Sequence, residues 1–191
     1  DCVIAFAQSE PKSRWALHDV STTAKKDGAG YVLSGHKAVV LGGPQACHLL
    51  VSARTGGGQR EASGISLFLV PKSAKGITTR DYPTLDGSRA SEVYFENVSV
   101  GAEHLLGAAD AALPVIERIV DNANAAYLSE AVGCLRMMCS STQDYAKSRK
   151  QFGRAIAEFQ VIQHRLVDMF MATEESVSMA LLATIKLDAS A

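Results

Sequence analysis

Apolar and polar residues alternate in a series of short runs along the first half of the chain. Turn-forming residues separate these runs, as at Glu10–Pro11, at Asp27–Gly30 and at Gly56–Gly58. Alternation with a period of two is typical of strands, and short strands joined by such turns favour an antiparallel barrel or sandwich. The expected strands cover residues 3–8, 22–26, 31–33, 37–41, 48–53, 65–70 and 91–98.

The spacing of apolar residues changes to three and four after Gly107, which indicates two long helices. Asp110 is the expected N-cap of the first helix, Pro114 fits only in its first turn, and Gly153 marks the break before the second. The apolar face expected on the first helix consists of Leu113, Ile116, Val120, Ala123, Tyr127, Ala131, Cys134 and Met138. The face expected on the second consists of Phe159, Ile162, Leu166, Met169, Thr173, Val177, Ala180, Thr184 and Leu187.

The two patterns together predict a multi-domain α+β fold. Residues 1–107 are expected to form the antiparallel β-barrel or sandwich domain, and residues 108–191 two long antiparallel helices of an incomplete four-helix bundle. Two amphipathic helices cannot bury all of their apolar surface alone, so they need further helices from the same protein or from another subunit. The chain begins without Met and ends at Ala191 within the helical pattern, so we expect both ends to continue in a longer protein.

Charge and composition narrow the range of partners. The chain is 47% hydrophobic and 20% charged with a net charge of -1, which is typical of a soluble globular protein and offers no general attraction to nucleic acid or an anionic membrane. No signal peptide and no apolar run of about 20 residues is visible, so we expect a cytoplasmic protein without a membrane span. The four cysteines, Cys2, Cys47, Cys134 and Cys139, form no Cys-x-x-Cys pair, and we expect reduced thiols and no metal site.

The residues most suggestive of ligand binding follow the first expected helix. A basic helix end with a glycine stop explains positive charges such as Arg149, but it does not explain Phe152 after them or Gln160 and Gln163 beside an apolar stripe. Fixed positive charge with amide donors suits a diphosphate and a nucleobase, because arginine holds phosphate oxygens in bidentate geometry. Gly56–Gly58 lacks the spacing of a phosphate-binding loop, and we expect it to be a hairpin tip.

Several segments share their order and spacing with one enzyme family. The run Arg149–Gly153 has the form Arg-x-x-Phe-Gly, and Phe159–Gln160 and Leu166–Met169 follow it. Gln8–Pro11 is similar to a Thr-Glu-Pro loop, and Tyr31–Lys37 to a hairpin of the form Tyr-x-Leu-Asn-Gly-x-Lys. Together with residues 64–71, 93–100 and 131–133, these segments resemble the middle β-domain and the first part of the C-terminal helical domain of acyl-CoA dehydrogenases.

The resemblance implies an FAD enzyme that removes an α-proton from an acyl-CoA thioester and passes the β-hydride to N5 of the flavin. Phe6, Gln8 and Ser9 would lie along the isoalloxazine ring. Arg149 and Phe152 would reach the FAD of a neighbouring subunit. The full set of flavin-binding residues that it implies is Phe6, Gln8, Ser9, Val39, Leu41, Arg149, Phe152 and Gln160, the last near the adenosine, and the substrate-binding residues are Asp121 and Asn124.

This chain departs from the family pattern at several of these positions. Val39 stands where many members have a flavin-packing Trp, Leu41 where a Thr often hydrogen-bonds the ring, and Asn124 where an Arg is common. Ala123 occupies the position of the catalytic base in one subgroup, and in most members the base lies beyond this segment. No catalytic carboxylate is therefore named, and we expect the chain alone to be inactive. The loop Pro11–Trp15 lacks the small residues that are usual in the family. In these departures the chain resembles bacterial branches that act on dicarboxyl- or steroid-derived acyl-CoA.

Two main hypotheses for function follow from the resemblance. The first is an FAD-dependent acyl-CoA dehydrogenase that works as a homodimer, homotetramer or heterotetramer and passes electrons to an electron-transferring flavoprotein. The second is a non-catalytic partner subunit that helps bind a neighbour's FAD, for which Val39, Leu41 and Asn124 are the motivation. A carbohydrate-binding β-sandwich with a helical dimerisation tail explains the two periods but none of the motifs.

Overall fold

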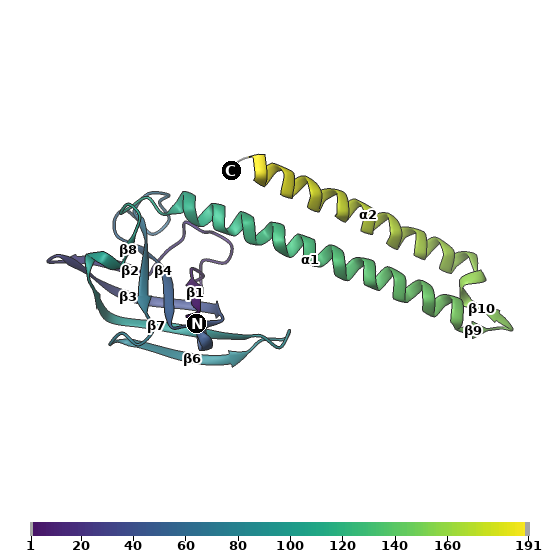
Figure 1. The fold of residues 1–191 in the computed structure, drawn as a ribbon, viewed down its shortest axis with the longest axis horizontal. Coiled ribbons are helices and arrows are strands. Elements are labelled where there is room, and N and C mark those ends of the chain that lie inside the picture. Colours follow the sequence, from purple (N-terminus) through teal and green to yellow (C-terminus); the bar gives the residue numbers. More distant parts are fainter. Residues whose placement is uncertain (1, 190–191) are drawn as a thin grey trace. The chain divides into compact units, whose positions relative to one another are not determined.

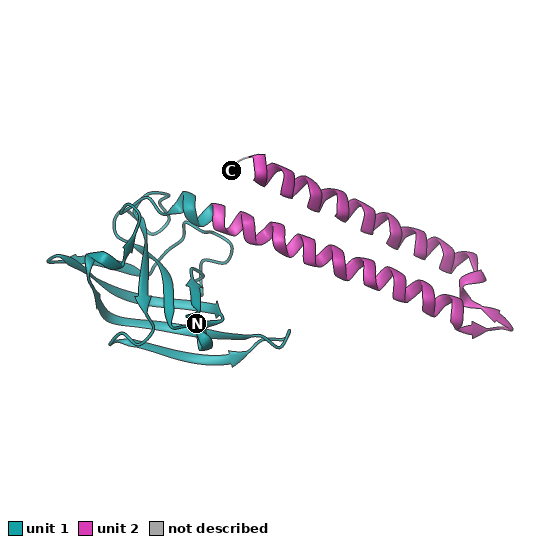
Figure 2. Cartoon of the chain, viewed as in Figure 1, with its two compact units in different colours: residues 1–117 teal, residues 118–191 magenta. Residues whose placement is uncertain are grey.

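The structure is a computed structural model that describes residues 2–189, in two compact units that meet between Glu117 and Arg118 (Figure 2). The first unit is built around one sheet, and the second consists of two helices joined by a small hairpin (Figure 1). The strands are β1 (Ile4–Ala7), β2 (Thr23–Asp27), β3 (Gly30–Leu41), β4 (His48–Arg54), β5 (Ile65–Pro71), β6 (Ile77–Pro83), β7 (Arg89–Val100), β8 (Leu105–Leu106), β9 (Lys150–Gln151) and β10 (Arg154–Ala155). The helices are α1 (Leu113–Ser148) and α2 (Gln160–Ala189), with single 3₁₀ turns at Gly43–Gln45, Ala102–His104 and Ile156–Glu158.

The predicted fold class is confirmed, with a refinement of the sheet. In the described part of the chain the strands form an open sheet in the order β6-β7-β3-β2-β4-β5-β8, so the sheet does not close into a barrel. Most neighbours are antiparallel, but β1 pairs with β4 in parallel, and so does one residue of β2. Strand β6 was not predicted, because it is a largely exposed edge strand whose residues carry little apolar signal.

The core of the first unit lies where β4 and β5 pair with each other. Seven residue pairs join these two strands, and their apolar side chains are almost fully buried. Strands that are buried on both faces read as continuous apolar runs, as Ile65–Val70 does. The cluster also takes in side chains from β3 and β7, including Leu33, Val93 and Phe95. This core supports the short strand β1, which lies beside β4.

The loop between β4 and β5 is the hairpin tip expected at Gly56–Gly58. The guanidinium of Arg54 organises it by donating to the carbonyl oxygens of Glu61, Ser63, His18 and Gln59 at 2.6–3.0 Å. Gly64 closes the loop with a positive φ of 82°, and a Cβ there would lie 2.1 Å from the carbonyl oxygen of Gly56. Only glycine fits this position without a shift of the backbone.

The two long predicted helices are confirmed, and α1 and α2 run antiparallel within the second unit (Figure 1). The predicted face of α2 is almost entirely correct, since eight of its nine residues are buried or half-buried and Thr184 alone among them is exposed. On α1 the predicted face is wrong beyond its first turns, because Tyr127 and Met138 are exposed. After Val120, the buried or half-buried residues of α1 are instead Ala125, Val132, Leu135, Cys139, Gln143 and Ala146.

The start of α1 also differs from the prediction. Asp110 is not its N-cap: its carboxylate accepts a hydrogen bond from Thr55 Oγ1 at 2.6 Å, outside the helix. The carbonyl oxygen of Ala112 accepts the first helical bond, from the amide of Ile116 at 3.0 Å. Pro114 lies in the first turn, as predicted. Within residues 2–189, neither helix is long and apolar enough to cross a membrane.

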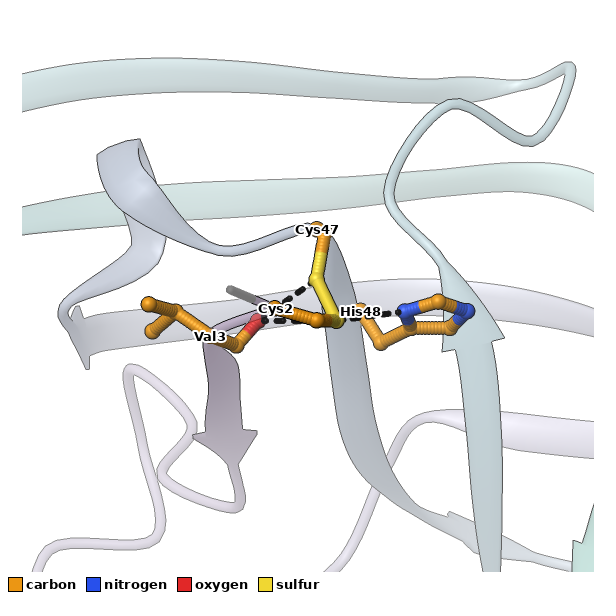
Figure 3. Close-up of a disulfide and its surroundings, with 4 residues drawn as sticks. All are labelled: Cys2, Val3, Cys47 and His48. Carbon is orange, nitrogen blue, oxygen red and sulfur yellow. Dashed lines mark hydrogen bonds between the residues drawn. A yellow bond between two sulfur atoms is a disulfide. The ribbon is translucent and has the colours of Figure 1, made fainter.

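Cys2 and Cys47 form a disulfide, so the prediction of reduced thiols is wrong for these two residues (Figure 3). Parallel pairing of β1 with β4 places them side by side although 45 residues separate them in the sequence. That proximity depends on the sheet topology and leaves no local signal. Cys134 and Cys139 are free thiols in the described structure.

Candidate functional site

The segment Gln8–Ser9 that follows β1 is held by a buried lysine from β3. Lys37 is fully buried, and its ammonium donates to the Gln8 carbonyl oxygen at 3.2 Å, to Glu10 Oε1 at 2.8 Å and to Ser52 Oγ at 3.0 Å. The amide of Ala38 adds a hydrogen bond to the carbonyl oxygen of Ser9 at 2.9 Å. Three acceptors around one ammonium fix the backbone of this segment in one position.

Glu10 completes the anchor from the other side. Its carboxylate accepts hydrogen bonds from the amides of Ser21 at 2.8 Å and Thr22 at 3.0 Å, and from the Ser21 hydroxyl. Burial raises the pKa of Glu10, but the Lys37 ammonium and these donors outweigh it and lower that pKa from 4.5 to about 2. Burial lowers the pKa of Lys37 to about 8, against the attraction of Glu10. The two groups therefore form an ion pair at neutral pH.

Val39 lies next to this anchor in a strained conformation. Its φ is +53°, at the irregularity between Lys37 and Val40 in the pairing of β3 with β7. A β-branched residue is rarely found there, and strain of this kind gathers at functional sites. The Val39 side chain is 53% exposed although it is apolar. The backbone therefore holds an apolar group at the surface beside Ser9.

A second polar cluster lies behind Val39 and centres on Glu92 of β7. Its carboxylate lies 2.6 Å from His36 Nε2 and accepts the Tyr82 hydroxyl at 2.9 Å and the Val39 amide at 3.4 Å. Burial raises the pKa of Glu92, but the hydrogen bonds from Tyr82 and His36 outweigh that effect and hold the pKa below its ordinary value, so the carboxylate is ionised. The cluster holds the irregular stretch of β3 through the His36 side chain and the Val39 amide.

Phe6 lies on β1, just before the Gln8–Ser9 segment, and Leu41 lies at the end of β3, the strand that carries Lys37. Phe6 is half-buried on β1, opposite Leu50 of β4. Leu41 is 51% exposed at the end of β3 and offers no hydroxyl. The loop Pro11–Trp15 forms a turn closed by the Ser13 and Glu10 backbones, and Arg14 and Trp15 are exposed on it.

In the second unit, the residues predicted around Arg149 gather at the hairpin between the helices. Strands β9 and β10 pair antiparallel, and the two turn residues Phe152 and Gly153 both have a positive φ. Phe152 is 93% exposed, and its ring lies edge-on to Phe159 with centroids 6.2 Å apart. Arg149 directly follows the end of α1, and Gln160 begins α2. An exposed aromatic ring at a strained turn position is unfavourable for folding and suits a binding role.

Asp121 and Asn124 line one pocket of about 270 Å³ between the two helices. They lie one turn apart on α1, and Lys186 and Leu187 of α2 face them across the pocket. The structure thus joins the two residues predicted to bind substrate, and it adds a lysine that the sequence did not single out.

The sequence predicts Gln8, Ser9 and Val39 as flavin-binding residues but does not predict the groups that hold them. Lys37 and Glu10 belong to motifs of the family resemblance that imply no role for them, and no motif singles out Ser52 or Glu92. Lys37 stands directly before the apolar run Ala38–Leu41, and a lysine in a buried strand indicates that it has a partner of opposite charge. The sequence does not indicate which residues are its partners, because Glu10 and Ser52 lie far from Lys37 in the chain.

Cys2, Cys47 and His48 are a group whose possible metal ligands lie within 4.8 Å of one another. The two sulfur atoms are bonded to each other, so neither is a thiolate ligand in this structure. Metal ligation by this group would require reduction of the disulfide first.

Family models assign almost the whole chain. Residues 5–98 match the acyl-CoA dehydrogenase middle domain, and residues 113–191 match the acyl-CoA dehydrogenase C-terminal domain. The chain belongs to the acyl-CoA dehydrogenase family. This membership agrees with the resemblance found in the sequence, and it implies a flavin cofactor in the complete protein.

Individual acyl-CoA dehydrogenases and their relatives differ in their reactions. The chain is 33% identical over 172 residues to the mitochondrial long-chain specific acyl-CoA dehydrogenase of Sus scrofa, covering 88% of this chain and 40% of that protein. It is 30% identical to the 3-(aryl)acrylate reductase of Clostridium sporogenes, covering 87% of this chain and 45% of that protein. The glutaryl-CoA dehydrogenase structure from Mycobacterium smegmatis has a TM-score of 0.87 at 28% identity, covering 100% of this chain and 48% of that one. The chain thus spans less than half the length of these relatives.

The residues of the first unit fit a flavin in their chemistry. An isoalloxazine ring has flat apolar faces and a polar edge. The anchored segment offers the polar Gln8 and Ser9, while Val39 and Leu41 offer exposed apolar surface on the neighbouring strand. The Leu41 side chain has no group that can donate or accept a hydrogen bond.

Proposed function

We propose that the complete protein is an FAD-dependent enzyme that dehydrogenates an acyl-CoA thioester between its α and β carbons. The observation that carries this proposal is the Gln8–Ser9 segment, which the buried Lys37–Glu10 pair holds beside the strained and exposed Val39. A position so strongly fixed, with polar and apolar groups side by side, suits the recognition of a planar amphipathic ring. Family membership supports a flavin as that ring.

When bound, FAD supplies the acceptor for the β-hydride, and the residues of this chain hold and orient it. We propose that Gln8 and Ser9 contact its polar edge, while Phe6, Val39 and Leu41 pack against its apolar surface. A rigid contact surface holds the ring at a constant distance from the substrate, which favours transfer.

The hairpin at Arg149 is proposed to bind the FAD of a neighbouring subunit. Arginine can bind diphosphate oxygens in bidentate geometry. The ring of Phe152 is exposed and can pack against the bound cofactor. Gln160, at the start of α2, is proposed to lie near the adenosine. On this proposal each flavin site needs two chains.

For the acyl-CoA, we propose the pocket lined by Asp121 and Asn124. Lys186 at the same pocket adds a positive charge that suits an anionic group. The catalytic base is not assigned to any residue of this chain. The expected electron acceptor is an electron-transferring flavoprotein.

A visible spectrum of the full-length protein, recorded before and after addition of acyl-CoA thioesters, tests the proposal. The panel should contain a long-chain, a glutaryl and an aryl-propionyl thioester, which follow the names of its relatives. Flavin absorption that bleaches with one thioester supports the dehydrogenase and identifies its substrate class. A protein that cannot be reconstituted with FAD contradicts the proposal.

A second function, a non-catalytic partner subunit, is favoured by Leu41. Its exposed side chain offers no hydroxyl where the family often has a Thr, so its own flavin site is weaker in hydrogen bonds. Such a subunit would bind FAD only together with a second, different chain, through Arg149. Co-expression with candidate partner chains separates this function from the first, because flavin would then be retained only by the mixed complex.

A further inference from the structure

The disulfide at the start of β1 lies on the surface of the first unit beside a histidine (Figure 3). The Val3 carbonyl oxygen accepts the amide of Cys47 at 2.9 Å, which holds the two cysteine backbones together, with 5.8 Å between their Cα atoms. This separation lies within the range of protein disulfides. Both cysteines are exposed, so a small molecule can reach either sulfur.

The surroundings of the two sulfur atoms differ. Cys2 Sγ lies 3.4 Å from His48 Nδ1, whereas Cys47 Sγ lies 3.1 Å from the Val3 carbonyl oxygen. A protonated imidazole stabilises a thiolate next to it. A carbonyl oxygen repels a thiolate and accepts a hydrogen bond from a thiol. Cys2 is therefore the better leaving group and, once reduced, the better nucleophile of the two.

We propose that Cys2, Cys47 and His48 form a thiol–disulfide exchange site that reacts with a small thiol. The incoming thiolate bonds to Cys47 Sγ, the Cys2–Cys47 bond breaks, and Cys2 leaves as a thiolate that takes a proton from His48. A second thiol molecule then attacks the sulfur of the first thiol molecule in the mixed disulfide and releases Cys47 as a thiol. Two thiols are thereby oxidised to one small disulfide, and the protein disulfide is reduced by two electrons.

The site is separate from the proposed acyl-CoA chemistry in its residues, although β1 connects the two places. Cys2 lies two residues before β1, and Ala7, the last residue of β1, precedes Gln8. Exchange therefore makes and breaks a covalent tether just before the strand that leads into the Gln8–Ser9 segment, which is proposed to contact the flavin.

Mass spectrometry of the full-length protein under non-reducing conditions is the first test. We expect a Cys2–Cys47 cross-linked peptide and, when reduced glutathione is added to this disulfide form, a glutathione adduct on Cys47. The exposed Cys134 serves as an internal control and should gain the adduct more slowly. Free Cys2 and Cys47 that form no bond in oxidised glutathione would overturn the proposal, as would an adduct that favours Cys134.

The role of His48 has a separate test in the fully reduced protein. At pH 7, iodoacetamide should alkylate Cys2 before Cys47, and His48→Gln should slow the Cys2 reaction by about threefold or more while leaving Cys134 unchanged. His48→Asn is the second variant in case the first folds poorly. An unchanged Cys2 rate in a folded variant would show that the imidazole does not activate this thiol, and the proposed mechanism would be wrong.

Discussion

Lys37 is the residue on which the geometry of the Gln8–Ser9 segment depends most directly. Its ammonium bonds both to the backbone of that segment and to the carboxylate of Glu10. A buried ion pair is weak evidence of net stability, because both charges lose their hydration. Removal of one partner is nevertheless costly, since the other charge stays buried alone. We therefore interpret the pair as a device that positions the segment.

Replacement of Lys37 by Met should destabilise the protein by about 3–5 kcal/mol and lower its flavin content, because Glu10 is left without its partner. Lys25→Met, at an exposed position of β2, is the matched control and should change stability by no more than about 0.5 kcal/mol. Urea unfolding and the ratio of flavin to protein absorbance measure the two effects. Equal urea midpoints for the two variants would show that the ion pair does not anchor the segment.

The acid stability of the first unit should carry the signature of Glu10. Its pKa in the folded protein is about 2, below the ordinary 4.5, so its contribution is fully present above pH 4.5 and is lost as the pH falls toward 2. With allowance for solvent screening, this loss amounts to about 2 kcal/mol. The double variant Glu10→Gln/Lys37→Met lacks the titrating group, and its urea midpoint should fall less between pH 5 and about 2. Parallel pH profiles for the two proteins would contradict the prediction.

At the scale of elements, the loop between β4 and β5 shows how one glycine permits a turn. Gly64 and Gly87 have nearly the same positive φ, 82° and 83°, but a Cβ meets the Gly56 carbonyl oxygen at Gly64 and meets no atom within 4 Å at Gly87. Gly87→Ala should cost about 1 kcal/mol for its backbone conformation alone. Gly64→Ala should cost about 3 kcal/mol or more, because the clash adds to that cost. Thermal unfolding of both variants measures the difference, and equal losses would show that the loop relaxes freely.

The long helices illustrate a different principle. The predicted face of α2 is the one with the least exposure, but residues on its other sides, such as Phe170, Leu181 and Ile185, are apolar and exposed. Helix α1 has apolar residues on more than one side, among them Tyr127, Met137 and Met138, which stay exposed in this chain. Exposed apolar surface of this extent is typical of an interface with further protein.

For the whole molecule, the proposed sharing of flavin between subunits predicts that FAD retention depends on protein concentration. If Arg149 and Phe152 complete a neighbour's site, dilution that separates the subunits should release FAD, seen as a rise in flavin fluorescence. Arg149→Ala should shift this release to higher protein concentration by about tenfold, because a charge-assisted bond to phosphate contributes about 1.5–3 kcal/mol. Arg80→Ala, on the exposed edge strand β6, is the control and should leave the release unchanged. Release that is independent of concentration would favour a flavin site made by one chain.

Local patterns in the sequence determined the element types and the family. Alternation predicted the buried strands and a period of three to four predicted both helices, because each pattern follows from the geometry of its own backbone. The spacing of the Arg149–Gly153 and Gln8–Pro11 segments indicated the family, and Gln8, Ser9 and Val39 were named from it. Whether those residues bind flavin remains a prediction.

Only the tertiary structure decided which distant residues meet. The parallel pairing of β1 with β4 places Cys2 beside Cys47. The loop that contains Glu10 packs against β3, so that the Glu10 carboxylate pairs with Lys37. The edge position of β6 and the covered face of α1 likewise depend on what packs beside them. These features depend on contacts between residues far apart in the chain, and a periodic pattern within one segment carries no record of its partner.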